Sequence, residues 1–371
     1  MRITTPDSPE ARDGLAHLAV RATRLVPFAL LLAWPLAAQA QSEWRDRTAV
    51  EAVAAVSVAS GELTDPMVIL DAVATVRMGA GFDVIVRPYS RRLPGGDWAH
   101  ELYQLQVQYQ SPTRIPIRVD AGVVTSPLGL GTLEMRPDRN PIIGAPFYYY
   151  MPLPRFDART DRVNLLAPGY PIGVIVSASD VKWDLRGGVT DGTPARMRNA
   201  LSPDRPPAAA NVLAGGGWTP TPGLRVGGAV ARGPYRPTLA AILPSADATD
   251  ATVVTLEGEY AVGFTRVTAE WITDRFDTAG DPAVSRGYTL MAVRTLTPRV
   301  FVAARHSRAS TPVQLGPTLT RRDAAGADAT LGYRLIADIT LRGGYQGFRH
   351  YLSEDWEHAL ALSVVWAHRW H

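Results

Sequence analysis

The residues best suited to chemistry in this chain are arginines and tyrosines that gather in one stretch, residues 125–169. The stretch holds Arg136, Arg139, Arg155, Arg159 and Arg162, together with Tyr148 and Tyr149. A guanidinium group is always charged and presents several N–H donors, so these arginines are candidates for contact with anions. The same stretch also contains Glu134, Asp138, Asp157 and Asp161. Pairing between arginines and acids, which would only rigidify the stretch, therefore remains an equal alternative.

Catalytic and metal-binding motifs are absent from the sequence. His100, His306, His350, His358 and His368 stand singly, with no Gly-x-Ser-x-Gly or His-Glu-x-x-His arrangement around them. Acidic groups such as Glu354, Asp355 and Glu357 lack the spacing of a calcium loop. The sequence therefore predicts no catalytic residue, no cofactor and no metal site.

Composition excludes several classes of protein. The chain has 371 residues, no cysteine, 46% hydrophobic and 20% charged residues, which argues against a disordered or disulfide-stapled protein. Its formal net charge is +3, with Lys182 as the single lysine, and acids are interspersed among the arginines. No nucleic-acid partner is expected from that pattern.

The first forty residues have the layout of an export signal. Arg21 and Arg24 precede an apolar core, Leu25 to Ala37, and Ala38-Gln39-Ala40 supplies a small-x-small cleavage site. We therefore expect residues 1–40 to be a signal peptide and residues 41–371 to form the mature protein. Beyond residue 40 no apolar run is long enough for a spanning helix, so a membrane-embedded chain must be a closed β-barrel.

Alternation of apolar and polar residues recurs along the mature chain. Over residues 103–110, Tyr103, Leu105, Val107 and Tyr109 are expected to face one side of a strand and four glutamines the other. Such runs predict about sixteen strands, at 50–59, 67–78, 81–91, 99–110, 114–124, 170–179, 181–190, 209–219, 222–232, 251–262, 264–274, 284–296, 298–308, 326–336, 338–349 and 356–370.

These strands predict an all-β fold, a transmembrane antiparallel up-and-down barrel in which short turns alternate strictly with long loops. Residues 125–169 form the third long loop, and we expect it to fold into the lumen as a constriction. Inward parity predicts a pore lining of Arg118, Asp120, Lys182, Arg186, Glu257, Glu259 and Arg266, joined by Arg334 and Arg342.

The last strand and the third loop carry resemblances to known proteins. Leu360, Leu362, Val364, Trp366 and Trp370 share one face and resemble the C-terminal strand that the barrel-insertion machinery recognises in outer-membrane proteins. The segment 126–131, the aromatic-rich loop and the strand count together resemble the phosphate-selective (anion-type) porin superfamily. This chain lacks that family's lysine-rich constriction, so phosphate is not carried over as the solute.

The resemblance implies a passive aqueous channel in the bacterial outer membrane for small hydrophilic solutes, including anions. Its partners would be outer-membrane lipid, the solutes, the insertion machinery and two further copies in a homotrimer. Two alternatives stay open. One is an adhesive or structural barrel with a plugged lumen, and the other is a barrel enzyme with a nucleophile and a histidine on one wall at the bilayer interface.

Overall fold

A ring of sixteen antiparallel strands makes up the fold. The computed structural model describes residues 47–60, 65–130, 136–144, 170–191, 210–235, 249–277, 282–315, 318–350 and 353–370. The strands are β1 (Thr48–Ala59), β2 (Met67–Gly79), β3 (Phe82–Arg92), β4 (Trp98–Gln110), β5 (Ile117–Val123), β6 (Ile172–Ser179), β7 (Trp183–Asp191), β8 (Ala210–Thr221), β9 (Leu224–Tyr235), β10 (Thr249–Val262), β11 (Thr265–Phe276), β12 (Ala283–Thr297), β13 (Val300–Leu315), β14 (Thr318–Ile336), β15 (Ile339–Arg349) and β16 (Glu357–Trp370). In the described part of the chain, no helix is long and apolar enough to cross a membrane.

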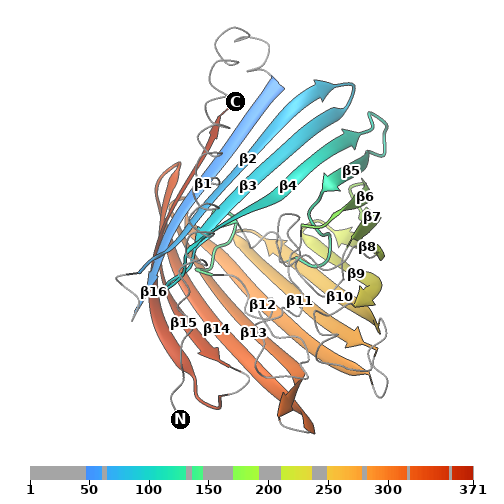
Figure 1. Cartoon of the computed structure of the whole chain (residues 1–371). Helices are drawn as coiled ribbons and strands as arrows, with labels where there is room; N and C mark the ends of the chain where they lie inside the picture. Colours follow the sequence, from blue (N-terminus) through green and yellow to red (C-terminus); the bar gives the residue numbers. More distant parts are fainter. Residues whose placement is uncertain are drawn as a thin grey trace, which may run out of the picture. The chain divides into compact units, whose positions relative to one another are not determined.

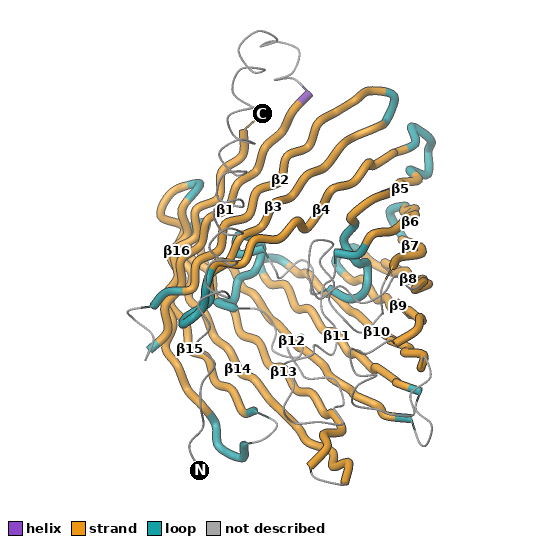
Figure 2. The backbone as a smooth tube through the Cα atoms, viewed as in Figure 1, coloured by secondary structure: helices purple, strands orange, loops and turns teal. Residues whose placement is uncertain are grey.

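Each strand pairs with its neighbours in sequence, and β1 pairs with β16 to close the barrel (Figure 1). The closing register runs from Val50 opposite Trp370 to Ala59 opposite Ala361. Figure 2 shows that most of the described chain is strand. Closure pairs every strand on both sides, so no strand edge is left open. The predicted all-β barrel of sixteen strands is confirmed.

The two ends of the barrel differ in their connections. At one end, here called the short-turn end, residues 80–81, 222–223, 263–264, 298–299 and 337–338 join consecutive strands. The opposite end, here called the long-loop end, includes the connection from β5 to β6. Gly223 has a φ of 86°, and a Cβ there would lie 2.2 Å from the carbonyl oxygen of Ala261, so the turn after β8 requires glycine.

The predicted strict alternation of short and long connections was wrong in two places. Residues 111–116 at the short-turn end make a longer connection than residues 93–97 at the long-loop end, and the hairpin of β13 and β14 has a short connection at the long-loop end. β13 extends to Leu315 and β14 begins at Thr318, eight residues before its predicted start. Cross-strand pairing continues from Arg308 opposite Ala325 to Leu315 opposite Thr318. An ion pair between Arg308 and Asp323, at 2.6 Å, also joins the two strands there. Polar cross-strand pairs of this kind stabilise the two strands beyond the apolar stretch that the sequence pattern detects.

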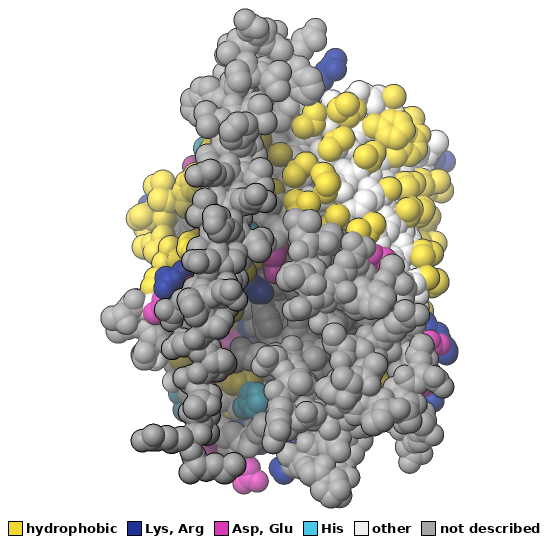
Figure 3. Space-filling view, viewed as in Figure 1, with side chains coloured by type: hydrophobic (Ala, Val, Ile, Leu, Met, Phe, Trp, Pro, Cys, Tyr) yellow, Lys and Arg dark blue, Asp and Glu magenta, His cyan; other side chains and the backbone are white. Residues whose placement is uncertain are grey.

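Side chains alternate across the wall as the sequence predicts. On β10, Leu256 is 56% exposed on the outer face, whereas its neighbour Glu257 is 4% exposed on the inner face. Hydrophobic side chains gather over β2, β3 and β4 in Figure 3. The barrel therefore has an apolar outer surface and a polar interior, as a barrel in a lipid bilayer requires.

Tyr103 departs from this pattern. Leu105 and Val107 are 48% and 47% exposed on the outer face as expected, but Tyr103 is fully buried. The register between β3 and β4 shifts between Arg87 and Pro88, which turns the side chains beyond it over to the other face. Proline has no N–H for the ladder and is confined to such irregular positions. The prediction that Tyr103 faces outward was therefore wrong.

Candidate functional site

Residues 136–144, here called the crossing segment, lie against the inner wall far from the strands they connect. The chain leaves the wall after β5, yet Arg136 Nη1 lies 2.9 Å from Glu51 Oε2 on β1. Gln346 on β15 donates from Nε2 to the carbonyl oxygen of Ile143 at 2.6 Å. On β13, Arg305 donates to the carbonyl oxygen of Gly144 at 3.3 Å. The segment thus contacts three strands that are not neighbours of β5 or β6 in the ring.

Arg342 on β15 holds the middle of the crossing segment. Its Nη1 donates to the carbonyl oxygens of Pro137 and Asn140, at 3.1 and 2.7 Å, and its Nη2 donates to Ser363 Oγ at 3.0 Å. Within the segment, Asn140 Nδ2 donates to the carbonyl oxygen of Gly144 at 2.8 Å. Ile142 is 1% exposed and packs against Met291 and Ala303. Carbonyl oxygens and apolar contacts together hold this part of the chain in place.

The two arginines of the crossing segment have different surroundings. The side chain of Arg136 is 7% exposed and also bonds Asp138, from Nε to Oδ1 at 3.0 Å. Arg139 is 53% exposed, and its nearest acid, Glu51, is 3.8 Å away. Arg136 therefore fits the pairing interpretation, whereas Arg139 remains accessible to a solute. Arg155, Arg159, Arg162, Tyr148 and Tyr149 lie outside the described residues.

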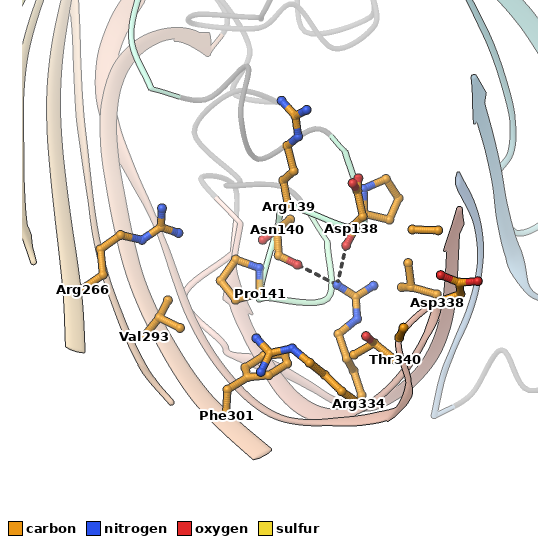
Figure 4. A pocket seen from close by; sticks show the side chains of 15 residues that line it. Asp138, Arg139, Asn140, Pro141, Arg266, Val293, Phe301, Arg334, Asp338 and Thr340 are labelled. Carbon is orange, nitrogen blue, oxygen red and sulfur yellow. Dashed lines mark hydrogen bonds between the residues drawn. The ribbon is translucent and has the colours of Figure 1, made fainter. Parts of the chain in front are cut away.

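A cavity of about 310 Å³ lies between the crossing segment and the short-turn end (Figure 4). Its wall includes Arg139, Arg266, Arg334, Arg342 and Phe301, and we call it the arginine cavity. The guanidinium carbon of Arg334 lies 5.3 Å from the centre of the Phe301 ring, a cation–π distance. Phe301 in turn covers Gly332 on the next strand, where a Cβ would lie 2.0 Å from the ring. Glycine at position 332 therefore makes room for the ring.

The acids that line the arginine cavity are both engaged elsewhere. Asp138 accepts a hydrogen bond from Arg136, and Asp338 Oδ2 lies 2.7 Å from His368 Nδ1. Arg334 Nη1 donates to the carbonyl oxygen of Pro298 at 2.9 Å, and no carboxylate among the described residues pairs with it. Arg266 likewise has no carboxylate partner among the described residues. The arginine cavity consequently has an excess of positive charge.

A second group of charges is balanced. Arg225 on β9 bonds both oxygens of Asp184, at 2.8 and 2.9 Å, and its Nη1 bonds Glu257 Oε1 at 2.8 Å. Arg186 Nη2 reaches the same Glu257 oxygen at 2.9 Å. Two cations and two anions thus form a network on the inner wall. The structure brings the predicted Arg186 and Glu257 together, and Glu259 lies across from Arg225 in the register.

Arg225 was missed by the sequence prediction, although its inward parity in β9 is readable from the alternation. A Cβ at Gly217 would lie 2.4 Å from Nη2 of Arg225, so the guanidinium lies flat over this glycine. The run of glycines on β8 was the available signal, because glycine in a strand often marks the close approach of another group.

The remaining predicted lining residues fall in two places. Arg118 Nε lies 2.7 Å from Asp120 Oδ2 on β5, and Gln106 Nε2 donates to Asp120 Oδ1 at 2.9 Å. Both predicted residues are therefore on the inner wall as a pair. Lys182 instead lies exposed in the turn at residues 180–182, because β7 begins only at Trp183, so its placement on the strand wall was wrong.

Both ends of the third loop are anchored by a stack of tyrosines that the sequence analysis did not anticipate. Tyr103 stacks on Tyr89 and on Tyr170, with ring centres 4.1 and 3.9 Å apart. Val123, at the end of β5, packs in the same cluster. Arg87 lies over the rings of Tyr103 and Tyr170, at 5.3 and 5.8 Å. Burial raises the pKa of the Tyr170 phenol, which precedes β6, to about 12.

Asp71 completes this group. Its two oxygens accept bonds from Nε and Nη2 of Arg87 at 2.9 and 2.6 Å. Such a bidentate contact orients the guanidinium and neutralises it in a buried place.

Among the described residues, no cluster of three or more histidine, cysteine, aspartate or glutamate side chains is arranged to hold a metal ion.

Comparison with known proteins identifies the fold. No protein-family model and no curated protein matches the sequence. Among solved structures, Salmonella typhi OmpF in complex with daunomycin aligns with a TM-score of 0.55 at 11% identity, over 86% of this chain and 97% of that one. An anion-selective porin from Comamonas acidovorans aligns with a TM-score of 0.54 at 10% identity, over 87% and 99%.

The trimer form of OmpT, an outer membrane protein of Vibrio cholerae, aligns with a TM-score of 0.53 at 9% identity, over 86% and 98%. At such identities the likeness shows the fold alone. The chain therefore has the barrel fold of outer-membrane porins, and the predicted resemblance is confirmed at that level.

Proposed function

We propose that the chain is an outer-membrane porin, a passive aqueous channel for small hydrophilic solutes that favours anions. The observation that carries the proposal is the arginine cavity, whose acids are paired elsewhere while Arg266 and Arg334 line the space without a carboxylate partner among the described residues. A barrel of sixteen strands is wide enough to leave a water-filled interior, unlike a barrel of eight. The crossing segment, which lies against the inner wall, narrows that interior.

Electrostatics favours anions only moderately. Two unit charges 4 Å apart interact by about 1 kcal/mol in bulk water and about 4 kcal/mol near a protein surface, whereas a tenfold preference needs about 1.4 kcal/mol. The two unpaired arginines, Arg266 and Arg334, are thus sufficient for a measurable preference. The paired groups, Arg118 with Asp120 and Arg225 with Asp184, contribute little.

The assembly and location follow from the same proposal. Removal of residues 1–40 on export remains a prediction from the sequence. The trimer form of Vibrio cholerae OmpT supports a homotrimer for this chain, with outer-membrane lipid around it. Insertion by the barrel-insertion machinery would use the C-terminal strand, β16.

The test is single-channel recording in a planar bilayer with a salt gradient across it. We expect persistent conductance steps and a reversal potential displaced toward the anion. Changing Arg266→Gln and Arg334→Gln together should move the reversal potential toward cations while the channel stays open. Arg294→Gln is the matched control, since Arg294 is an exposed arginine on the outer face of β12. A silent bilayer from well-folded protein would instead favour the plugged, adhesive barrel.

One contact bears on the enzymatic alternative. Ser90 Oγ and His100 Nδ1 lie 2.8 Å apart on the outer wall, beside Trp98, whose ring centre is 6.1 Å from that of His100. A nucleophilic serine also needs its histidine oriented by a third group. In the described part of the chain no carboxylate bonds to His100, so the channel remains the better proposal. Ester hydrolysis by the refolded protein that disappears in Ser90→Ala would reverse this choice.

A further inference from the structure

The outer face of β9 to β15 carries a row of arginines near the long-loop end. On β12, Tyr288 and Leu290 are exposed while Thr289 and Met291 are buried, which identifies even-numbered positions as outward-facing. Because register partners on neighbouring strands point to the same face, the strand register places six arginines on the outer face. These are Arg232, Arg275, Arg286, Arg308, Arg321 and Arg349, here called the arginine belt.

The arginine belt lies only toward the long-loop end of these strands. Toward the short-turn end of the same strands the outward positions are apolar, as at Tyr260, Val262, Tyr333 and Leu335, which are 39% to 55% exposed. Arg294 is the outward arginine at that end among the described residues. A charged side chain facing hydrocarbon is destabilising, and the cost falls near the interfaces. The belt must therefore lie above the apolar layer, at one leaflet.

Aromatic side chains mark the height of that leaflet's boundary. Trp271, Tyr288 and Tyr345 are 38% to 40% exposed on the outer face. Arg308 lies directly across from Tyr288 in the register, and Arg286 is two positions further along β12. Exposed tryptophan and tyrosine rings gather at the level of lipid headgroups. The guanidinium groups consequently reach the height of the headgroup phosphates.

The positive charge of the belt is only partly compensated. Asp250 and Asp277 contact Arg232 and Arg275, and Asp323 contacts Arg308. These three aspartates stand against six arginines. Arg286 and Arg321 have no carboxylate partner among the described residues, so their charge is available to an external anion.

These two arginines converge on one serine. Ser310 is the register partner of Arg286, and Arg321 Nη1 donates to Ser310 Oγ at 3.1 Å. Nη2 of Arg321 donates to the carbonyl oxygen of Val284 at 3.0 Å, which stretches the side chain from β14 across β13 to β12. Asp323 is the other register partner of Ser310 and hydrogen-bonds with it, but this carboxylate is already paired with Arg308. Two guanidinium groups without a carboxylate partner among the described residues therefore lie beside one hydroxyl and one paired carboxylate on the outer face.

We propose that this area, Arg286 and Arg321 around Ser310, binds the phosphate of an anionic lipid headgroup in the leaflet at the long-loop end, with the rest of the belt adding long-range attraction. Guanidinium groups suit phosphate because their N–H groups match its oxygens two at a time. The site faces the bilayer and stands beside the aromatic ring level, so the phosphate arrives on a lipid. The proposal is independent of which solute the channel passes.

The experiment uses the refolded protein in nanodiscs of phosphatidylcholine with or without bisphosphorylated lipid A. Lipid retained after detergent extraction is counted by native mass spectrometry for the wild type, for Arg286→Gln with Arg321→Gln, and for Arg294→Gln as the matched control. We expect the wild type and the control to retain lipid A. The double variant should bind it at least about tenfold more weakly, because each arginine near an anionic surface contributes appreciably. Single-channel conductance should stay unchanged, since both residues are outside the lumen.

Three results would overturn the proposal. They are equal retention of lipid A and phosphatidylcholine by the wild type, equal retention of lipid A by the double variant and the control, and displacement of lipid A by inorganic phosphate, which would indicate a site for the free ion. Folding is checked by heat-dependent mobility in electrophoresis. Should the double variant fail to fold, Arg286→Gln alone carries the same test, since it breaks no described hydrogen bond.

Discussion

Arg136 Nη1 lies 2.9 Å from Glu51 Oε2, and this ion pair joins the first strand of the barrel to a segment that departs from the fifth. The two residues are 85 positions apart in sequence. Because Arg136 is 7% exposed and also bonds Asp138, it holds the crossing segment in place and is not free to attract solutes.

Replacing both partners, with Glu51→Gln and Arg136→Gln, removes the ion pair and leaves the net charge unchanged. We expect the crossing segment to loosen, because a partly buried pair of this kind contributes on the order of 1–3 kcal/mol. Single-channel records should show greater current noise with an unchanged reversal potential. Arg139→Gln, at the exposed neighbour, should leave the current noise unchanged and shift the reversal potential toward cations. A quiet channel in the double variant would argue against the anchoring role.

The contact between Phe301 and Gly332 gives a second prediction. Gly332→Ala puts a methyl group into the ring of Phe301, which costs about 1–3 kcal/mol of stability unless the ring moves. Movement of the ring would also disturb Arg334, which lies over it. Urea unfolding in detergent should show the loss, and Phe301→Leu combined with Gly332→Ala should recover part of it. If Phe301→Leu restores no stability to Gly332→Ala, the clash between the new methyl group and the Phe301 ring is not the cause of the loss.

The third prediction tests the tyrosine stack. Tyr103→Ala should cost about 3–5 kcal/mol, because it removes a fully buried ring that packs against two others. Among the described residues, the buried hydroxyl of Tyr103 has no hydrogen-bond partner. Tyr103→Phe should therefore keep the stability or raise it by about 1 kcal/mol. A marked loss in Tyr103→Phe, measured by the same unfolding assay, would show that the hydroxyl is bonded.

Tyr170 provides a prediction about alkaline pH. The unfolded phenol has a pKa of about 10, whereas burial raises the pKa of the folded phenol to about 12. The folded state thus binds the phenol proton more tightly than the unfolded state. The resulting contribution to the free energy of unfolding is fully present below about pH 10 and is lost as the pH rises toward 12. Unfolding midpoints should fall over that interval, and Tyr170→Phe should flatten the fall. Identical pH profiles for both proteins would contradict the burial of the phenol.

The strand number and the two faces of the wall could be predicted because they depend on a local property. Successive side chains of a strand point to opposite sides, so Leu105 outside and Gln106 inside are readable from adjacent letters. The same reading placed Arg118, Arg186 and Arg266 on the inner face. It failed at Tyr103, where a register shift opposite Pro88 changes the parity, and at Lys182, which lies in a turn.

By itself the sequence determined that the chain forms a barrel with a polar interior and an arginine-rich third loop. Only the tertiary structure decided which charges are neutralised. Arg136 meets Glu51 and Arg225 meets Asp184 and Glu257 because ring closure and strand register bring distant residues together. Arg266 and Arg334 have no such acid among the described residues. Local alternation says which way a side chain points, but the partner that it meets depends on the neighbouring strands and on the segment that crosses the barrel.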